Sequence, residues 1–196
     1  MPHEAESATH AALSALCGPA LGTPEWLLRP GLRECADKWT LMQEVYRYLT
    51  SQQLPDEMPL RETRRVDGVF LYRGSTFIFE LDEIQHFNTY RATILRCYPD
   101  DLPLAFDKEE WIKRCARKTK LEGGGFAKPR PPLFPAENGR HQQRAFRDAL
   151  ADILPTCHGF LPTLRLGDWE VARWIELDDS ADRVAALVEE RLGPYV

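Results

Sequence analysis

Three carboxylates flank one predicted β-hairpin, at positions that bring them to the same end of a sheet. Asp67 opens the first of two runs of β-branched and aromatic residues, and Glu80 and Asp82 close the second. A polar Arg-Gly-Ser break at 73–75 predicts a tight turn in which Gly74 supplies the positive φ. Because antiparallel strands bring opposite ends together and side chains alternate, we expect Asp67 near Glu80 and Asp82, with the last two on one face.

Oxygen ligands of this kind suit Mg²⁺ or Mn²⁺, and a divalent ion there could make a bound water more acidic. We therefore take Asp67, Glu80 and Asp82 as candidate metal ligands. His86 could act as general base because an imidazole titrates near neutrality, and Gln85 could hold water or phosphate. Two simpler interpretations stay open: acidic residues are common at strand ends, and a lone His86 is often structural.

The same residues resemble a known family. Asp67, a hairpin and then Glu80-x-Asp82 are similar to the PD-(D/E)XK, or restriction-endonuclease-like, nuclease superfamily. The stretch from Glu80 to His86 resembles more closely the Glu-x-Asp-x-x-x-His variant of the branch near very-short-patch-repair endonucleases. Segments at 143–150, 154–159 and 162–165 resemble an uncharacterised bacterial family placed in that superfamily. Together these segments cover roughly the middle and C-terminal two thirds of the chain.

The resemblance implies an α/β fold with a restriction-endonuclease-like mixed central sheet flanked by helices, in a single domain. We expect residues 33–196 to form this domain and residues 1–32 an N-terminal helical extension. The implied activity is that of a metal-dependent endonuclease, with DNA the favoured substrate and the Leu81 carbonyl a third ligand. At Asp82 the common superfamily pattern has Lys, so Asp82 either binds metal or marks a site that has lost activity. In the Glu-x-Asp-x-x-x-His variant this replacement is the normal pattern.

Two other functions compete with the nuclease. The chain could be a catalytically inactive nuclease-fold module that binds nucleic acid or a partner protein. It could also be a metal-dependent hydrolase of a small phosphorylated molecule. The sequence lacks a Rossmann glycine fingerprint, a Gly-x-Ser-x-Gly elbow and a zinc-spaced Cys/His set, which weakens redox, esterase and zinc-finger interpretations.

The charge is unevenly distributed. The net charge is −5, but residues 113–147 carry ten Lys or Arg against two acids, so this segment is +8 and the rest −13. Such a segment could position a nucleic-acid backbone, or it could be an ordinary solvated helix face. Arg61, Arg64 and Arg65 precede the first strand and could grip a phosphate or neutralise the carboxylates when no metal is bound. The expected nucleic-acid contacts are Arg65, Lys113, Arg117, Lys128, Arg130, Arg144 and Arg147.

Length and composition set the remaining expectations. The 196 residues fit one domain, and no run approaches the roughly 18 apolar residues of a membrane span. The acidic, Ala-rich start lacks the basic flank of a signal peptide, so the expected compartment is the cytoplasm. Five scattered cysteines indicate buried free thiols. A single-site nuclease that cuts both strands usually dimerises, so a homodimer is a possible partner.

Hydrophobic periodicity predicts the elements around the hairpin. The first helix, at 5–16, is expected to be frayed or peripheral. The Gly- and Pro-rich stretch 123–132 could be a lid over substrate or a plain connecting loop. We expect further helices at 33–49, 90–98, 108–120, 141–154 and 180–192, and further strands at 102–106 and 164–174.

Overall fold

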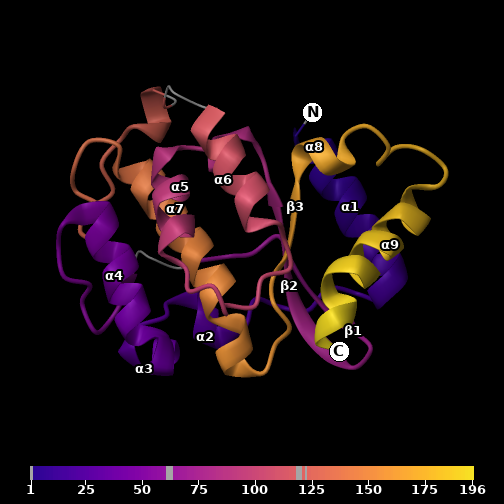
Figure 1. Ribbon diagram of the computed structural model, residues 1–196, viewed down its shortest axis with the longest axis horizontal. Helices are drawn as coiled ribbons and strands as arrows, with labels where there is room; N and C mark the ends of the chain where they lie inside the picture. The colour runs from indigo at the N-terminus through magenta and orange to yellow at the C-terminus, as the bar shows by residue number, and fades with distance from the viewer. Residues whose placement is uncertain (1, 61–63, 118–120, 122) are drawn as a thin grey trace.

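Helices cover both faces of a small mixed sheet in the computed structural model, which describes residues 2–60, 64–117, 121 and 123–196 (Figure 1). Strands β1 (Gly68–Tyr72) and β2 (Ser75–Asp82) pair antiparallel, and β2 pairs parallel with β3 (Leu164–Gly167), giving the order β1-β2-β3. The α/β class with a helix-flanked mixed sheet is confirmed at this level.

The hairpin forms in the predicted register. Tyr72 lies opposite Ser75, and Gly68 lies opposite Phe79. Both residues of the turn have positive φ, 50° at Arg73 and 86° at Gly74, as a two-residue turn between right-handed twisted strands requires. This register places the start of β1 next to the end of β2.

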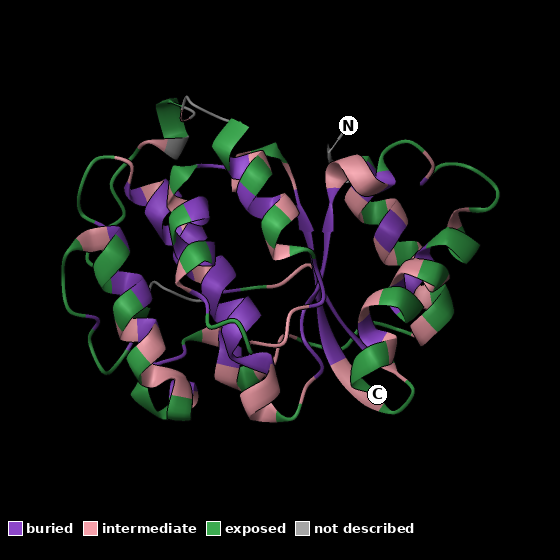
Figure 2. Ribbon diagram, viewed as in Figure 1, coloured by how far each residue is buried: buried purple, intermediate pink, exposed green. Residues whose placement is uncertain are grey.

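The two faces of the sheet differ in chemistry. On one face, Phe77, Phe79 and Leu81 belong to an apolar cluster with residues of α1 (Pro2–Cys17) and α9 (Ser180–Leu192). The other face of β2 ends in two buried acids, Glu80 and Asp82, and it lies toward the helices α5 (Thr89–Cys97), α6 (Lys108–Arg117) and α7 (Gly139–Ile153). Figure 2 shows α7 as one of the most buried helices.

Local capping explains where two of these helices begin. The Asn88 side chain accepts a hydrogen bond from the Arg91 backbone N–H at 3.1 Å, and Asp107 accepts one from Glu110 at 3.0 Å. The remaining described elements are α2 (Glu25–Leu28), α3 (Leu32–Cys35), η1 (Ala36–Lys38), α4 (Trp39–Thr50), η3 (Ile84–His86), η4 (Gly124–Phe126), η5 (Pro155–His158), α8 (Asp168–Val171) and η6 (Gly193–Tyr195).

Three predicted elements differ in the structure. The helix expected at 33–49 is interrupted at Ala36, whose φ of 48° ends α3 before α4 begins. The run 102–106 contributes only an isolated bridge from Ala105 to Leu164, since Pro103 has no N–H to donate. The strand expected at 164–174 stops at Gly167, where the Glu170 carboxylate accepts the Gly167 N–H at 2.7 Å and starts α8.

The cysteines and the Gly- and Pro-rich stretch match their expectations only in part. All five cysteines are free, but only Cys35 and Cys115 are buried. The stretch 123–132 is bound to the start of α7, because the Asn138 and Arg140 N–H groups donate to the carbonyls of Ala127 and Lys128. The end expected for the fourth helix, residues 118–120, lies outside the described residues.

The first helix is an integral part of the core, contrary to the expectation of a peripheral element. Leu13 is fully buried and Ala5 nearly so, in the cluster shared with α9 and the sheet.

We expect Leu13→Ala to lower the free energy of unfolding by about 2 to 5 kcal/mol, because it opens a cavity beneath the sheet. Leu16→Ala is the control, since Leu16 is 43% exposed on the same helix. Equal effects in urea denaturation would show that α1 is a loosely attached extension.

Candidate functional site

Asp67 and Glu80 lie side by side where β1 begins and β2 approaches its end. Asp67 immediately precedes β1, and its Oδ2 accepts a hydrogen bond from the Leu81 backbone N–H at 2.8 Å. Burial, and then the negative charge of Glu80, raise the pKa of Asp67 to about 7. Two neighbouring carboxylates that repel each other in this way form a natural position for a cation.

Arg64 supplies positive charge to this pair. Its Nη2 lies 2.5 Å from Glu80 Oε1, and both side chains are buried. The Nε and Nη1 atoms of Arg64 are also buried, and neither has a hydrogen-bond partner among the residues that the structure describes. Of the two roles considered for these arginines, the Arg64 contact matches neutralisation of a carboxylate. Arg65 is exposed, and Arg61 lies outside the described residues.

Asp82 joins a different group from the one predicted. It is fully buried, and it accepts hydrogen bonds from Arg165 Nη1 at 2.5 Å and from Trp111 Nε1 at 2.7 Å. His86 Nδ1 lies 3.4 Å from Asp82 Oδ1 and 3.2 Å from Asp148 Oδ2. In the described part of the chain, the set of three residues with potential ligand atoms within 4.8 Å of one another is Asp82, His86 and Asp148. The expected grouping of Asp82 with Asp67 and Glu80 is therefore replaced by an Asp–His–Asp cluster.

A buried ionic network supports this cluster from α7 and β3. The Arg165 side chain is fully buried, and its Nε lies 2.8 Å from Asp152 Oδ1. Asp152 Oδ2 accepts from Arg91 Nη2 at 2.7 Å and from the Tyr98 hydroxyl at 2.8 Å. Arg165 Nη2 also lies 3.7 Å from Asp148 Oδ1. The network ties strands β2 and β3 to helices α5 and α7 through charge pairs inside the core.

The charge on His86 depends on its two acidic neighbours. Burial alone would lower the pKa of the imidazole, but Asp148 and then Asp82 outweigh it and raise the pKa of His86. Burial correspondingly favours the neutral form of Asp148, yet His86 and Arg165 hold the pKa of that carboxyl well below its usual range. The two carboxylates thus favour the protonated form of the His86 imidazole.

The Asp–His–Asp cluster also has the dimensions of a metal site. For an octahedral ion with bonds of about 2.1 Å, neighbouring ligand atoms lie about 3 Å apart, and His86 Nδ1 is 3.2 and 3.4 Å from its acidic neighbours. However, both Asp82 oxygens already accept hydrogen bonds, from Arg165 and Trp111. An ion there would have to displace the His86 proton in a buried position. At the Asp67–Glu80 pair, an ion would compete with Arg64 at Glu80 and with a proton at Asp67 rather than with the His86 imidazole.

The structure separates the other predicted site residues. Gln85 donates its side-chain amide to Glu83, which lies two positions earlier. Of the expected nucleic-acid contacts, Lys113, Arg117, Lys128 and Arg130 are exposed, whereas Arg144 and Arg147 on α7 are half-buried. Lys118, Lys120 and Glu122, which belong to the basic segment 113–147, lie outside the described residues.

Sequence reasoning missed Asp148 and Arg165 as parts of the site. A signal for Asp148 exists: Asp148 and Asp152 are separated by one helical turn and lie among apolar residues of α7. Acids on the buried side of a helix require a cationic partner, and Arg165 in a buried strand is such a partner. Trp111 carries no comparable signal, because a Trp on an apolar helix face predicts only core packing.

No protein-family model, curated protein or solved structure matches this chain. Among the described residues, no helix combines the length and apolar character that crossing a membrane requires.

The Asp67–Glu80 pair predicts a pH-dependent stability. Because the folded-state pKa of Asp67, about 7, lies above its ordinary value, protonated Asp67 favours the fold fully at low pH and this contribution is lost as pH rises through about 7. An asparagine side chain at this position cannot ionise. We therefore expect the free energy of unfolding of Asp67→Asn to increase by roughly 1 to 3 kcal/mol relative to that of the native chain as the pH rises from 5 to 8. Thermal unfolding of both proteins across this pH range measures the difference. Parallel pH profiles for the two proteins would contradict this effect of Glu80 and burial on Asp67.

Proposed function

We propose that this chain is a metal-dependent nuclease that hydrolyses phosphodiester bonds in nucleic acid, with DNA the favoured substrate. One observation carries the proposal. The end of the hairpin presents a repelling carboxylate pair, Asp67 and Glu80, and shortly after β2 a histidine that two further carboxylates hold by one ring nitrogen. A cation site and a proton-transfer group are the two parts that phosphodiester hydrolysis requires.

Asp67 and Glu80 would hold Mg²⁺ or Mn²⁺, which are suited to carboxylate oxygens. The ion would supply charge neutralisation at the phosphate and a more acidic water. With a cation bound, Glu80 no longer depends on Arg64 for its counter-charge. Arg64 would then turn to a non-bridging phosphate oxygen through Nε or Nη1, which are buried in this structure and have no hydrogen-bond partner among the described residues.

His86 would transfer the proton. Its Nδ1 is held by Asp82 and Asp148, which leaves Nε2 as the ring nitrogen for proton exchange with water. In this arrangement Asp82 positions the imidazole and does not bind the ion, which differs from the role inferred from the sequence. Asp82 in place of a Lys is then compatible with activity, since the histidine and Arg64 carry the functions of a cationic side chain.

Exposed cations would bind the nucleic-acid backbone. Lys113 and Arg117 lie on α6, and Lys128 and Arg130 lie on the segment that precedes α7. Phosphate contacts of this kind give an affinity that falls as salt rises. A cytoplasmic location and a homodimer that cuts both strands belong to the same proposal.

The test is cleavage of supercoiled plasmid, single-stranded DNA and RNA with Mg²⁺, Mn²⁺ or EDTA. We expect cleavage by the native chain with metal, none with EDTA, and a loss of at least about 10³-fold in Glu80→Gln. Glu189→Gln is the control, because Glu189 is an exposed acid that contacts Tyr72 and Arg73 at the opposite end of the hairpin. Cleavage that survives in Glu80→Gln would contradict the proposed metal ligand.

Two outcomes would favour the competing functions. A folded chain that binds DNA but cleaves nothing under any metal condition is an inactive module. A chain that hydrolyses small phosphate esters with metal, with no inhibition by excess DNA of arbitrary sequence, is a hydrolase of small molecules.

A further inference from the structure

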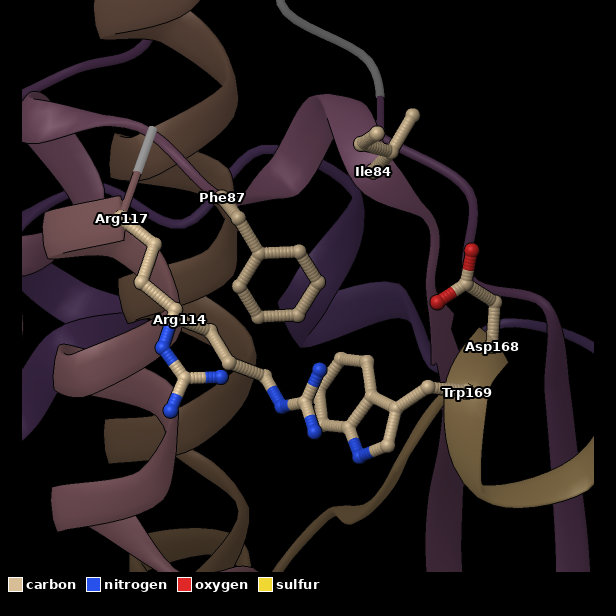
Figure 3. A pocket seen from close by; sticks show the side chains of 6 residues that line it. All are labelled: Ile84, Phe87, Arg114, Arg117, Asp168 and Trp169. Carbon is tan, nitrogen blue, oxygen red and sulfur yellow. The ribbon is translucent and has the colours of Figure 1, made fainter. Parts of the chain in front are cut away.

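A pocket of about 360 Å³ opens beside the carboxyl ends of the two parallel strands (Figure 3). Asp168 comes directly after β3, and Ile84 follows shortly after β2. The ends of parallel strands are a common position for ligand sites, and the volume is that of a pocket for a small ligand. The lining residues are Ile84, Phe87, Arg114, Arg117, Asp168 and Trp169.

The pocket contains a preformed stacking platform. The Arg114 guanidinium lies over the Trp169 ring, with its central carbon 3.6 Å from the ring centroid. Glu110 fixes it in this position through an ion pair with Arg114 Nε at 2.8 Å. Phe87 and Trp111 pack edge-on against the same indole, with centroids 4.9 and 5.0 Å away. Because the guanidinium is already placed over the indole and paired with Glu110, a planar ring that enters the pocket can stack on it at little entropic cost.

The polar groups of the pocket select the kind of ring. Figure 3 shows the Asp168 carboxylate at the edge of the pocket, opposite the Phe87 ring, with the two arginines on a third side. Asp168 is half-buried, so a carboxylate there gains most from a ligand with two adjacent N–H donors. Guanine presents such a pair at N1 and N2 on its Watson–Crick edge. Arg117 is exposed beside the pocket, where it can bind a phosphate attached to that base.

The pocket is also connected to the Asp–His–Asp cluster. Trp111 donates its indole N–H to Asp82, and its ring packs against Trp169. Ile84 lies between Asp82 and His86 in the chain. A base held in this pocket would therefore lie next to the residues proposed to hydrolyse the backbone.

We propose that this pocket binds a guanine base, stacked on the Arg114–Trp169 pair and hydrogen-bonded through N1 and N2 to Asp168. The proposal rests on the nuclease function and deepens it by giving it a base preference. Its binding step nevertheless stands apart from cleavage and is measured without metal.

The experiment is a titration of the full-length protein with GMP, IMP and AMP in EDTA, followed by tryptophan fluorescence and calorimetry. We expect GMP to bind most tightly and IMP, which lacks the N2 amine, more weakly. Asp168→Asn should reduce GMP affinity about 5- to 100-fold and leave AMP unchanged. Asp178→Asn is the matched control, because Asp178 is an exposed aspartate that does not line the pocket. GMP that binds no more tightly than AMP, or equally to Asp168→Asn, overturns the proposal.

Two further comparisons complete the experiment. The first distinguishes a base in a strand from a free nucleotide as the ligand, and the second distinguishes failure of the guanine proposal from failure of the nuclease proposal. If the ligand is a base in a strand, the oligonucleotide TTGTT should bind more tightly than both GMP and TTTTT. If the ligand is a free nucleotide, GMP should bind more tightly than TTGTT. Guanine binding by a chain that does not cleave would overturn only the nuclease. Cleavage by a chain that binds no mononucleotide would overturn only the guanine pocket.

Discussion

Replacing Arg165 by methionine should lower the free energy of unfolding by about 3 to 5 kcal/mol, the largest stability loss that we expect from a single substitution in this chain. Arg165 is fully buried and lies within 2.8 Å of both Asp82 and Asp152. Methionine fills similar space but leaves these carboxylates without their shared cation inside the core. For a chain of this length, that loss corresponds to a decrease in Tm of more than about 6 °C.

The control for this effect is Arg183→Met. Arg183 pairs with Asp179 on the surface at 2.8 Å, and both side chains are about half exposed. Surface pairs contribute at most about 1 kcal/mol, so this variant should be nearly as stable as the native chain. Similar losses for the two arginines, in denaturant unfolding at equal ionic strength, would show that the buried network is not needed for the fold.

For the proposed nuclease, we expect His86→Gln to reduce cleavage by about 10²- to 10⁴-fold, with the protein still folded and the proposed metal site intact. The glutamine retains a polar group near Asp82 and Asp148 but cannot accept and release a proton near neutral pH. His10→Gln is the matched control, since His10 lies on α1 and contacts the edge of Phe70 on the other face of the sheet. Full activity in His86→Gln would remove His86 from the proton-transfer step.

Asp148→Asn separates a positioning role from a structural one. Asp148 raises the pKa of His86, so its removal should lower that pKa. If His86 acts as a base, activity rises with pH as the imidazole loses its proton, and the acidic limb of the profile should move to lower pH in this variant. A lower rate with an unmoved limb would indicate that Asp148 only stabilises the fold.

The hairpin was predictable because its signals are local. Alternating β-branched and aromatic residues define both strands, and Gly74 marks a turn whose φ other residues rarely adopt. The positions of Asp67 and Glu80 at the same end of the hairpin follow from this register alone. Their proximity needs no information from distant parts of the chain.

The partners of Asp82 were not predictable in the same way. Its position on a strand fixes which face it occupies but not which helix covers that face. Arg165 reaches Asp82 from 83 residues away, and Asp148 reaches His86 from 62 residues away, so only tertiary packing brings them there. The sequence pattern therefore predicted that Asp82 lies with the acids nearest to it in the chain. In the folded protein Asp82 is buried and contacts Arg165 and His86 instead.

The same limit applies to the first helix and to the short elements. Alanines at helical spacing in α1 predict a helix, but the contact with α9 that buries Leu13 depends on a segment at the other end of the chain. A single residue, Ala36, adopts a positive φ that no periodicity indicates. Local propensity gives the element, and tertiary contacts decide its end and its burial.

The most direct test of the proposed site is a crystal grown with Mn²⁺ at pH 8 and examined for anomalous scattering. We expect a peak within about 2.3 Å of carboxylate oxygens of both Asp67 and Glu80, with Arg64 no longer the counter-charge of Glu80. The peak should be absent in crystals of Glu80→Gln. A peak between Asp82, His86 and Asp148, or none at either position, would contradict the assignment of Asp67 and Glu80 as the metal ligands.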